Sequence, residues 1–149
     1  MSTHRFPAVR RLTGAAAGVG LMVVGLGLPA DASPNRVPLN VGQETTGSDT
    51  GASGSFTYTI AGDTLCYTLE VRDLSVDAVA AHIHVGPRKV AGPVVVPLSV
   101  GTGTSFTVDD CVTADPALLA AIDDDPRSYY VNVHTPTFPG GEVRGQLTH

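Results

Sequence analysis

Two neighbouring runs in which apolar and polar residues alternate constrain the fold most strongly. In "SFTYTIA" (55–61) Phe56, Tyr58 and Ile60 alternate with small polar residues, and "TLCYTLEV" (64–71) repeats the pattern. A period of two places the apolar side chains of a strand on one face. The dipeptide "GD" between the runs is a tight-turn signal. The segment therefore predicts a β-hairpin.

Further short runs bounded by turn residues predict six more strands, at 37–41, 80–85, 92–98, 104–112, 128–135 and 141–148. Pro38 lacks the N–H that a central strand needs, so the first of these runs is predicted to be an edge strand. "DPALLAAI" has Asp115 at an N-cap position and Pro116 after it, which predicts one short helix. The expected fold is all-β: an antiparallel Greek-key β-sandwich, immunoglobulin-like or superoxide-dismutase-like, with one short helix.

The N-terminal segment has the pattern of an export signal. Basic residues precede an uncharged run of 17 residues (12–28), and Ala30 and Ala32 form an A-x-A cleavage pattern. We expect a signal peptide over 1–32, cleaved after Ala32, and a mature domain over 33–149 that is secreted, extracellular or attached to the cell envelope.

A retained membrane anchor is the alternative, although a spanning helix needs about 20 apolar residues. We expect the mature chain not to span a membrane. The pair Arg10 and Arg11 leaves twin-arginine export open beside Sec export.

The charge of the expected mature chain argues against nucleic acid as a partner. Residues 33–149 contain six basic and thirteen acidic residues, a net charge of −7. Binding to a phosphate backbone depends on clustered Lys and Arg. The expected partner is an unidentified protein or envelope component.

The two cysteines both lie in the expected mature chain. An even cysteine count in an exported domain predicts a disulfide between Cys66 and Cys111. Two buried free thiols are the alternative reading. No C-x-x-C motif is present, which argues against catalytic thiol chemistry.

Three histidines in strand candidates form a possible metal site. His82 and His84 lie two apart in "AHIHV" and therefore share one face of a strand. His134 lies on the polar face of "SYYVNVHT". If the two strands are neighbours, three imidazoles project from one face, and imidazole suits copper, zinc or nickel. The alternative is a structural role, in which the rings bond backbone carbonyls or pack beneath a loop.

The last two strands are expected to form a hairpin through "PTFPGG", which brings Glu142 near His134. On its second strand, Arg144 alternates with apolar Val143 and lies two residues from Glu142. We expect Arg144 to pair with Glu142 or with another acid across this hairpin.

Four ordered motifs, "AHIHVG", "AGPVVVPL", "YYVNVHT" and "PGGEVRGQL", together with the opening segment 39–71, resemble the CHRD domain first described in chordin. The resemblance covers residues 37–148 and implies an extracellular β-sandwich module. Besides the three histidines, it implies these signature residues: Gly92, Pro93, Asn132, Gly141, Glu142, Arg144 and Gly145.

The order "HIH…AGP…NVH" is also similar in outline to copper-zinc superoxide dismutases. That resemblance implies a copper site, with zinc the less favoured ion. The zinc-site residues of those enzymes have no clear match here, which argues against dismutase activity.

Two hypotheses about function follow. The first is a non-enzymatic binding or structural module, and the second is a copper-binding or copper redox protein that uses His82, His84 and His134. We assign no catalytic residue, because no nucleophile or phosphate-loop motif is present.

Overall fold

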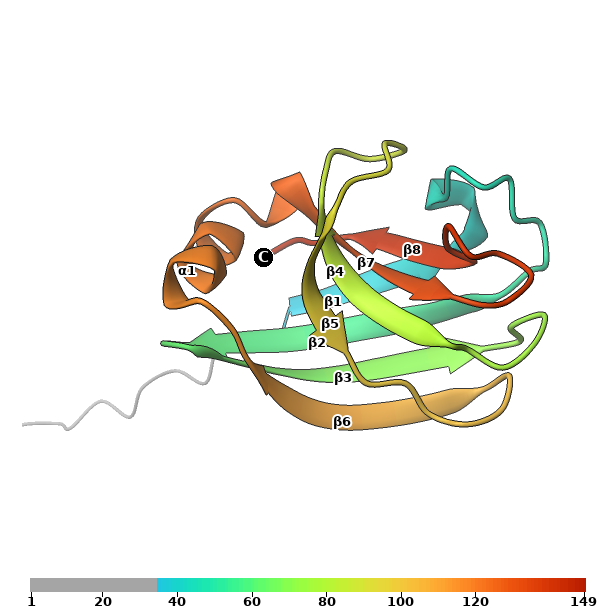
Figure 1. The fold of residues 1–149 in the computed structure, drawn as a ribbon, viewed down its shortest axis with the longest axis horizontal. Helices are drawn as coiled ribbons and strands as arrows, with labels where there is room; N and C mark the ends of the chain where they lie inside the picture. The colour runs from blue at the N-terminus through green and yellow to red at the C-terminus, as the bar shows by residue number, and fades with distance from the viewer. Residues whose placement is uncertain (1–34) are drawn as a thin grey trace, which may run out of the picture. The chain divides into compact units, whose positions relative to one another are not determined.

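The computed structural model describes residues 35–149, in which eight strands form one continuous antiparallel sheet (Figure 1). The expected cleavage site and signal peptide lie outside these residues. The strands are β1 (Asn35–Asn40), β2 (Ser53–Ala61), β3 (Thr64–Arg72), β4 (Ala80–Val85), β5 (Val94–Leu98), β6 (Phe106–Thr113), β7 (Tyr129–His134) and β8 (Val143–Gln146).

The sheet has the order β5-β4-β7-β8-β1-β2-β3-β6 and folds over a single core. Figure 1 shows β4 and β5 crossing in front of β2 and β3, so the two halves of the sheet lie on opposite sides of that core. Phe56 and Leu69 from one half and Ile83 and Val131 from the other are fully buried in it. The prediction of an all-β, sandwich-like antiparallel fold is confirmed.

The predicted hairpin is formed by β2 and β3, which pair in register from Ser53 and Arg72 to Ala61 and Thr64. Gly62 occupies the two-residue turn with φ +62°, a conformation that glycine adopts without strain. The apolar members of both strands face the core and the threonines face outward.

The prediction that Pro38 marks an edge strand is wrong. β1 lies inside the sheet, between β8 and β2. Its ladder with β2 covers the whole strand, whereas its ladder with β8 has one register pair, Asn40 and Arg144. A residue without an N–H fits in β1 because so little of the second ladder is formed.

The single α-helix of the described residues, α1 (Pro116–Asp124), begins where the sequence predicts. The Asp115 carboxylate accepts a hydrogen bond from the N–H of Ala117 at 2.8 Å, as an N-cap does. Leu119 and Ile122 are fully buried in the core. Two short 3-10 turns, Val41–Gln43 and Pro126–Ser128, complete the regular structure in this part of the chain. Across residues 35–149, no helix is long and apolar enough to cross a membrane.

The predicted disulfide is present. Cys66 on β3 and Cys111 on β6 are directly opposite one another in the ladder and are bonded. The reading as two free thiols is therefore wrong. The bond ties edge strand β6 to the hairpin and closes a loop over 45 residues of sequence.

Candidate metal centre

The three candidate histidines come from two neighbouring strands. β4 and β7 pair antiparallel, with His82 opposite Asn132 and His84 opposite Tyr130. His134 ends β7 on the same polar face. The apolar residues of both strands point the other way, into the core. The strand neighbourhood on which the sequence hypothesis depended is confirmed.

The three imidazoles form a compact triangle. One ring nitrogen from each lies within 4.8 Å of those of the other two. The ring centroids are 4.9 Å apart for His82 and His134 and 5.5 Å apart for the other two pairs. Among residues 35–149, no Cys, Asp or Glu joins this cluster. The donor set is thus three nitrogens, which suits copper, zinc or nickel better than the oxygen-binding ions calcium and magnesium.

Backbone carbonyls fix the orientation of two of the rings. Nδ1 of His84 lies 2.9 Å from the Gly92 carbonyl oxygen, and Nδ1 of His134 lies 3.0 Å from that of Pro139. A carbonyl only accepts, so Nδ1 carries the proton in both rings. In the neutral ring Nε2 then holds a lone pair.

These two Nε2 atoms face one another at 3.4 Å. With both Nδ1 atoms protonated, two neutral rings would place lone pair against lone pair, and no hydrogen bond would form. A cation between the two atoms resolves this arrangement. Two nitrogens bound tetrahedrally to one ion, at about 2.05 Å each, are about 3.3 Å apart. Carbonyls that hold the remote nitrogen of a ligating histidine are the usual support of such a site.

Burial favours the neutral form of the three rings. It lowers the pKa of His84, and His82 and Arg144 lower it further, whereas the bond to Gly92 raises it. Burial likewise lowers the pKa values of His82 and His134. Metals bind the neutral imidazole, so these shifts favour binding at neutral pH.

The comparisons with known proteins give one match. The family model of the CHRD domain matches residues 36–147, nearly all of the described chain. The chain belongs to the CHRD domain family. No curated protein and no solved structure matches it.

Several CHRD signature residues are glycines that allow backbone segments to pack closely together. At Gly92 a Cβ would lie 1.6 Å from the carbonyl oxygen of Val85, so only glycine lets the chain pass beside β4. At Gly141, where φ is +125°, a Cβ would overlap the side-chain amide of Asn132. Both glycines lie in the loops whose carbonyls hold the histidines. The carbonyl of Pro93 accepts the N–H of Val85 at 3.1 Å.

Gly145 lies in β8 opposite Val131. A Cβ there would come within 2.7 Å of the Pro38 carbonyl oxygen and of the Val37 side chain. This glycine therefore lets β8 approach β1 closely.

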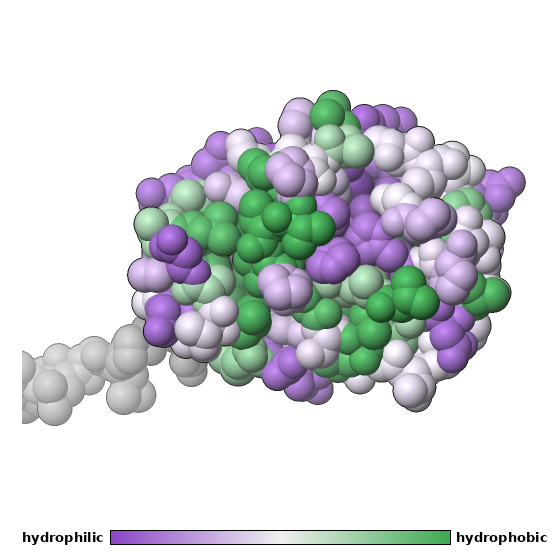
Figure 2. All heavy atoms as spheres, in the orientation of Figure 1, coloured by the Kyte–Doolittle hydropathy of each residue, from purple (hydrophilic) through white to green (hydrophobic). Residues whose placement is uncertain are grey.

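Arg144 holds the loop after β4 onto the CHRD sheet. Its side chain is almost fully buried, and it donates to the carbonyl oxygens of Val90 at 2.9 Å and Pro87 at 2.8 Å. Its guanidinium carbon lies 3.3 Å from the centroid of the Tyr130 ring. Figure 2 shows hydrophilic residues gathered in a hollow where Figure 1 places β7 and β8.

The expected pairing of Arg144 with Glu142 is wrong. The fully buried Glu142 carboxylate accepts hydrogen bonds from Thr50, from the N–H and hydroxyl of Ser75, and from Thr135, at 2.7 to 2.9 Å. Burial raises the pKa of Glu142, but these hydrogen bonds outweigh it and hold the pKa below its ordinary value. Glu142 thus joins three loops and stays ionised.

Sequence reasoning missed Glu44, which lies in a polar, glycine-rich loop with no distinctive pattern. Its side chain is 8% exposed, and both oxygens lack a hydrogen bond of normal geometry within residues 35–149. Burial raises its pKa from 4.5 to about 7, although Arg144 and the Thr45 amide lower it. Arg144 Nε and Asn132 Oδ1 are also buried without a partner in this part of the chain.

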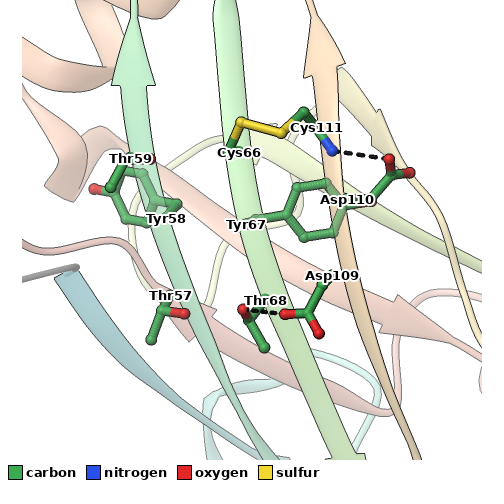
Figure 3. Close-up of a pocket in the computed structure, with 9 residues that line it drawn as sticks. All are labelled: Thr57, Tyr58, Thr59, Cys66, Tyr67, Thr68, Asp109, Asp110 and Cys111. Atoms are coloured by element: carbon green, nitrogen blue, oxygen red, sulfur yellow. Dashed lines mark hydrogen bonds between the residues drawn. A yellow bond between two sulfur atoms is a disulfide. The ribbon is translucent and has the colours of Figure 1, made fainter.

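The disulfide lies in a different region, on the outward face of β2, β3 and β6 (Figure 3). A shallow groove of about 410 Å³ runs along it, lined by Thr57, Tyr58, Thr59, Cys66, Tyr67, Thr68, Asp109, Asp110 and Cys111. None of the three histidines lines this groove. The predicted cysteines and histidines therefore lie in two separate regions, and only the histidines form a candidate centre.

Proposed function

We propose that this CHRD domain binds one transition-metal ion, copper in preference to zinc, through His82, His84 and His134. The observation that carries the proposal is the pair of Nε2 atoms facing one another at 3.4 Å, each in a ring held at Nδ1 by a backbone carbonyl. Copper is preferred because a nitrogen site binds Cu²⁺ most tightly among the divalent first-row ions.

Three nitrogens leave one position of a tetrahedral ion for a ligand from outside the chain. His82 is half-buried, whereas the other two rings are 7% and 8% exposed, so an outside ligand approaches from the side of His82. Tyr130 stacks on His84, with ring centroids 4.9 Å apart and planes 8° from parallel. The Tyr130 ring therefore covers one face of the His84 ring.

The test is the metal content of the protein after loading with Cu(II) or Zn(II) and desalting. We expect about one ion per chain in the wild type, and none in His84→Ala or His134→Ala with folding confirmed by circular dichroism. His149→Ala, which changes an exposed histidine at the chain end, is the matched control. A wild type that retains no metal, with histidine variants that only lose stability, would contradict the proposal.

A non-enzymatic binding module for a protein or envelope component is the second candidate. The exposed side chains of Val90 and Val94, 50% and 48% accessible, support it, because Val90 lies in the loop held by Arg144 and His84 and Val94 follows that loop. Arg88 and Lys89 at the tip of the same loop suit an anionic partner. A pull-down that compares the wild type with Val90→Ser tests this candidate. The wild type should capture a partner that the variant does not retain.

We also propose that the domain is exported. The basic segment, uncharged run and A-x-A pattern of residues 1–32 support this, and so does the disulfide, since such bonds persist in oxidising compartments. N-terminal sequencing of the exported protein is expected to start at Ser33. A start elsewhere would refute the cleavage site.

A further inference from the structure

The three histidines of the candidate centre are not held equally. His84 is bonded to the Gly92 carbonyl and stacked on Tyr130, and His134 is bonded to the Pro139 carbonyl. His82 has neither support: its Nδ1 is buried and has no hydrogen-bond partner in the described chain. Hydrogen bonds to backbone carbonyls therefore orient two rings of the centre, and no such bond orients the third.

The distances show the same asymmetry. The Nε2 atoms of His84 and His134 are already at the spacing that a bound ion requires. Any wider separation within the 4.8 Å limit of the cluster therefore involves His82. Any adjustment of the centre around a bound ion would therefore fall on the His82 ring, because the other pair is already in place.

The surroundings of His82 permit this movement. Its neighbours across the ladders are Asn132 on β7 and Pro97 on β5, the edge strand of this half of the sheet. Pro97 is exposed, and the ladder shifts register just beyond, between Ile83 and His84. His84 and His134 differ in this respect. If the metal ion left either of these rings first, a loop carbonyl would still hold the ring in its ligating orientation.

We propose that His82 is the first ligand of the centre to be exchanged, and that the domain passes its metal ion to and from an imidazole donor on another molecule. This inference rests on the proposed metal binding and names what the bound ion does. In the exchange, a bond would form between the incoming nitrogen and the metal as the bond from His82 breaks, and further acceptor nitrogens would then replace His84 and His134 in the same way. Each neutral imidazole would keep its lone pair when its bond to the metal breaks, and the oxidation state of the metal would not change.

The experiment measures transfer of Cu(II) from the loaded full chain to free histidine, followed by visible absorption in a stopped-flow instrument. In the wild type, the rate is expected to rise with histidine concentration, because the acceptor binds before the ion departs. His82→Ala is expected to transfer copper about 10-fold faster and to lose about 10-fold in affinity. His84→Ala and His134→Ala are expected to lose about 100-fold or more.

A second readout separates this role from a merely structural one. In the metal-free protein, nitrogen-15 relaxation of the imidazoles should show the His82 ring averaging between orientations, with His84 and His134 fixed. His149→Ala is the control for the kinetics.

Equal loss of affinity in His82→Ala and His84→Ala, or a transfer rate that does not depend on acceptor concentration, would overturn the inference and leave metal binding standing. A wild type that binds no copper would overturn both.

Discussion

The sheet has two polar faces, one on each half. The alternation of polar and apolar residues predicts the same exposure for both, but in the structure one face is mostly buried and the other is open to solvent. On β4, β7 and β8 the polar face carries His82, His84, Asn132, His134 and Arg144, and we call it the histidine face. On β2, β3 and β6 it carries Thr57, Thr59, Thr68, Asp109 and the disulfide, and we call it the threonine face. Four of the five named side chains of the histidine face are buried, whereas those of the threonine face are half-buried or exposed.

The two faces differ in burial because of the loops that cover the histidine face. The segments after β4 and after β7 fold over the histidine face and present carbonyl oxygens to Arg144, His84 and His134. Buried polar groups destabilise a fold unless they are bonded, so on this face each side chain either holds a loop or is left available for a ligand. The threonine face has no such constraint, because its side chains are half-buried or exposed and water can reach them.

The largest expected effect is on the histidine face. Arg144→Ala removes two hydrogen bonds from a buried cation to the loop after β4 and leaves a cavity, and it should destabilise the domain by about 3–5 kcal/mol in chemical denaturation. Arg72→Ala, which removes an exposed side chain paired with Glu70, is the matched control and should cost less than about 1 kcal/mol. An equal loss of unfolding free energy in the two variants would contradict the distinction between the two faces.

Loss of the disulfide is expected to have the next largest effect, on the threonine face. Reduction, or the double change Cys66→Ala and Cys111→Ala, should lower the free energy of unfolding by about 2–4 kcal/mol, since it releases a loop closed over 45 residues. Metal content at saturating metal should not change, because the disulfide lies outside the histidine cluster. An unchanged thermal midpoint with confirmed reduction would reject a stabilising bond.

Two buried carboxylates beneath the loops should respond to pH with opposite sign. Because the pKa of Glu44 is raised to about 7, its ionisation removes stability as the pH rises from its ordinary value of 4.5 to about 7. Glu44→Gln should therefore be more stable than wild type above about pH 8, by on the order of 1–2 kcal/mol after screening, and equal to it near about pH 4.

Glu142→Gln provides the opposite case. The pKa of Glu142 is lowered, so its contribution is present above its ordinary value and disappears as the pH falls through the lower folded value. The variant should be less stable at neutral pH, by about 2 kcal/mol, and should approach wild type in acid. Parallel pH profiles for the two variants would contradict the assignment.

The smallest effect is expected for Thr68→Val. Its hydroxyl donates to Asp109 on the exposed surface, where water replaces the lost partner. The free energy of unfolding should change by no more than about 0.5 kcal/mol. A loss above about 1.5 kcal/mol would show that the threonine face also depends on its side-chain hydrogen bonds.

Local patterns made much of the fold predictable. The alternation around Gly62 predicts the β2–β3 hairpin, and Asp115 with Pro116 predicts the start of α1. The histidine cluster was predictable only on the condition that β4 and β7 are neighbours, because their pairing joins residues about fifty positions apart.

The sequence did not predict the contacts that side chains make with backbone groups far away in the chain. The partners of Arg144 are carbonyl oxygens at positions 87 and 90, and no side-chain pattern marks a carbonyl. The burial of Glu44 depends on how its loop folds over β8. Pro38 gave a misleading signal, because the short β1–β8 ladder is a property of the assembled sheet.

The most direct test of a metal centre on the histidine face is nitrogen-15 NMR of the imidazole rings, before and after one equivalent of Zn(II). The structure predicts that His84 and His134 carry their proton on Nδ1 in the metal-free protein. Zinc should then shift Nε2 of both rings and one nitrogen of His82, and leave His149 unchanged. A proton on Nε2 of His84 or His134, or ring nitrogens that do not respond to zinc, would contradict the account.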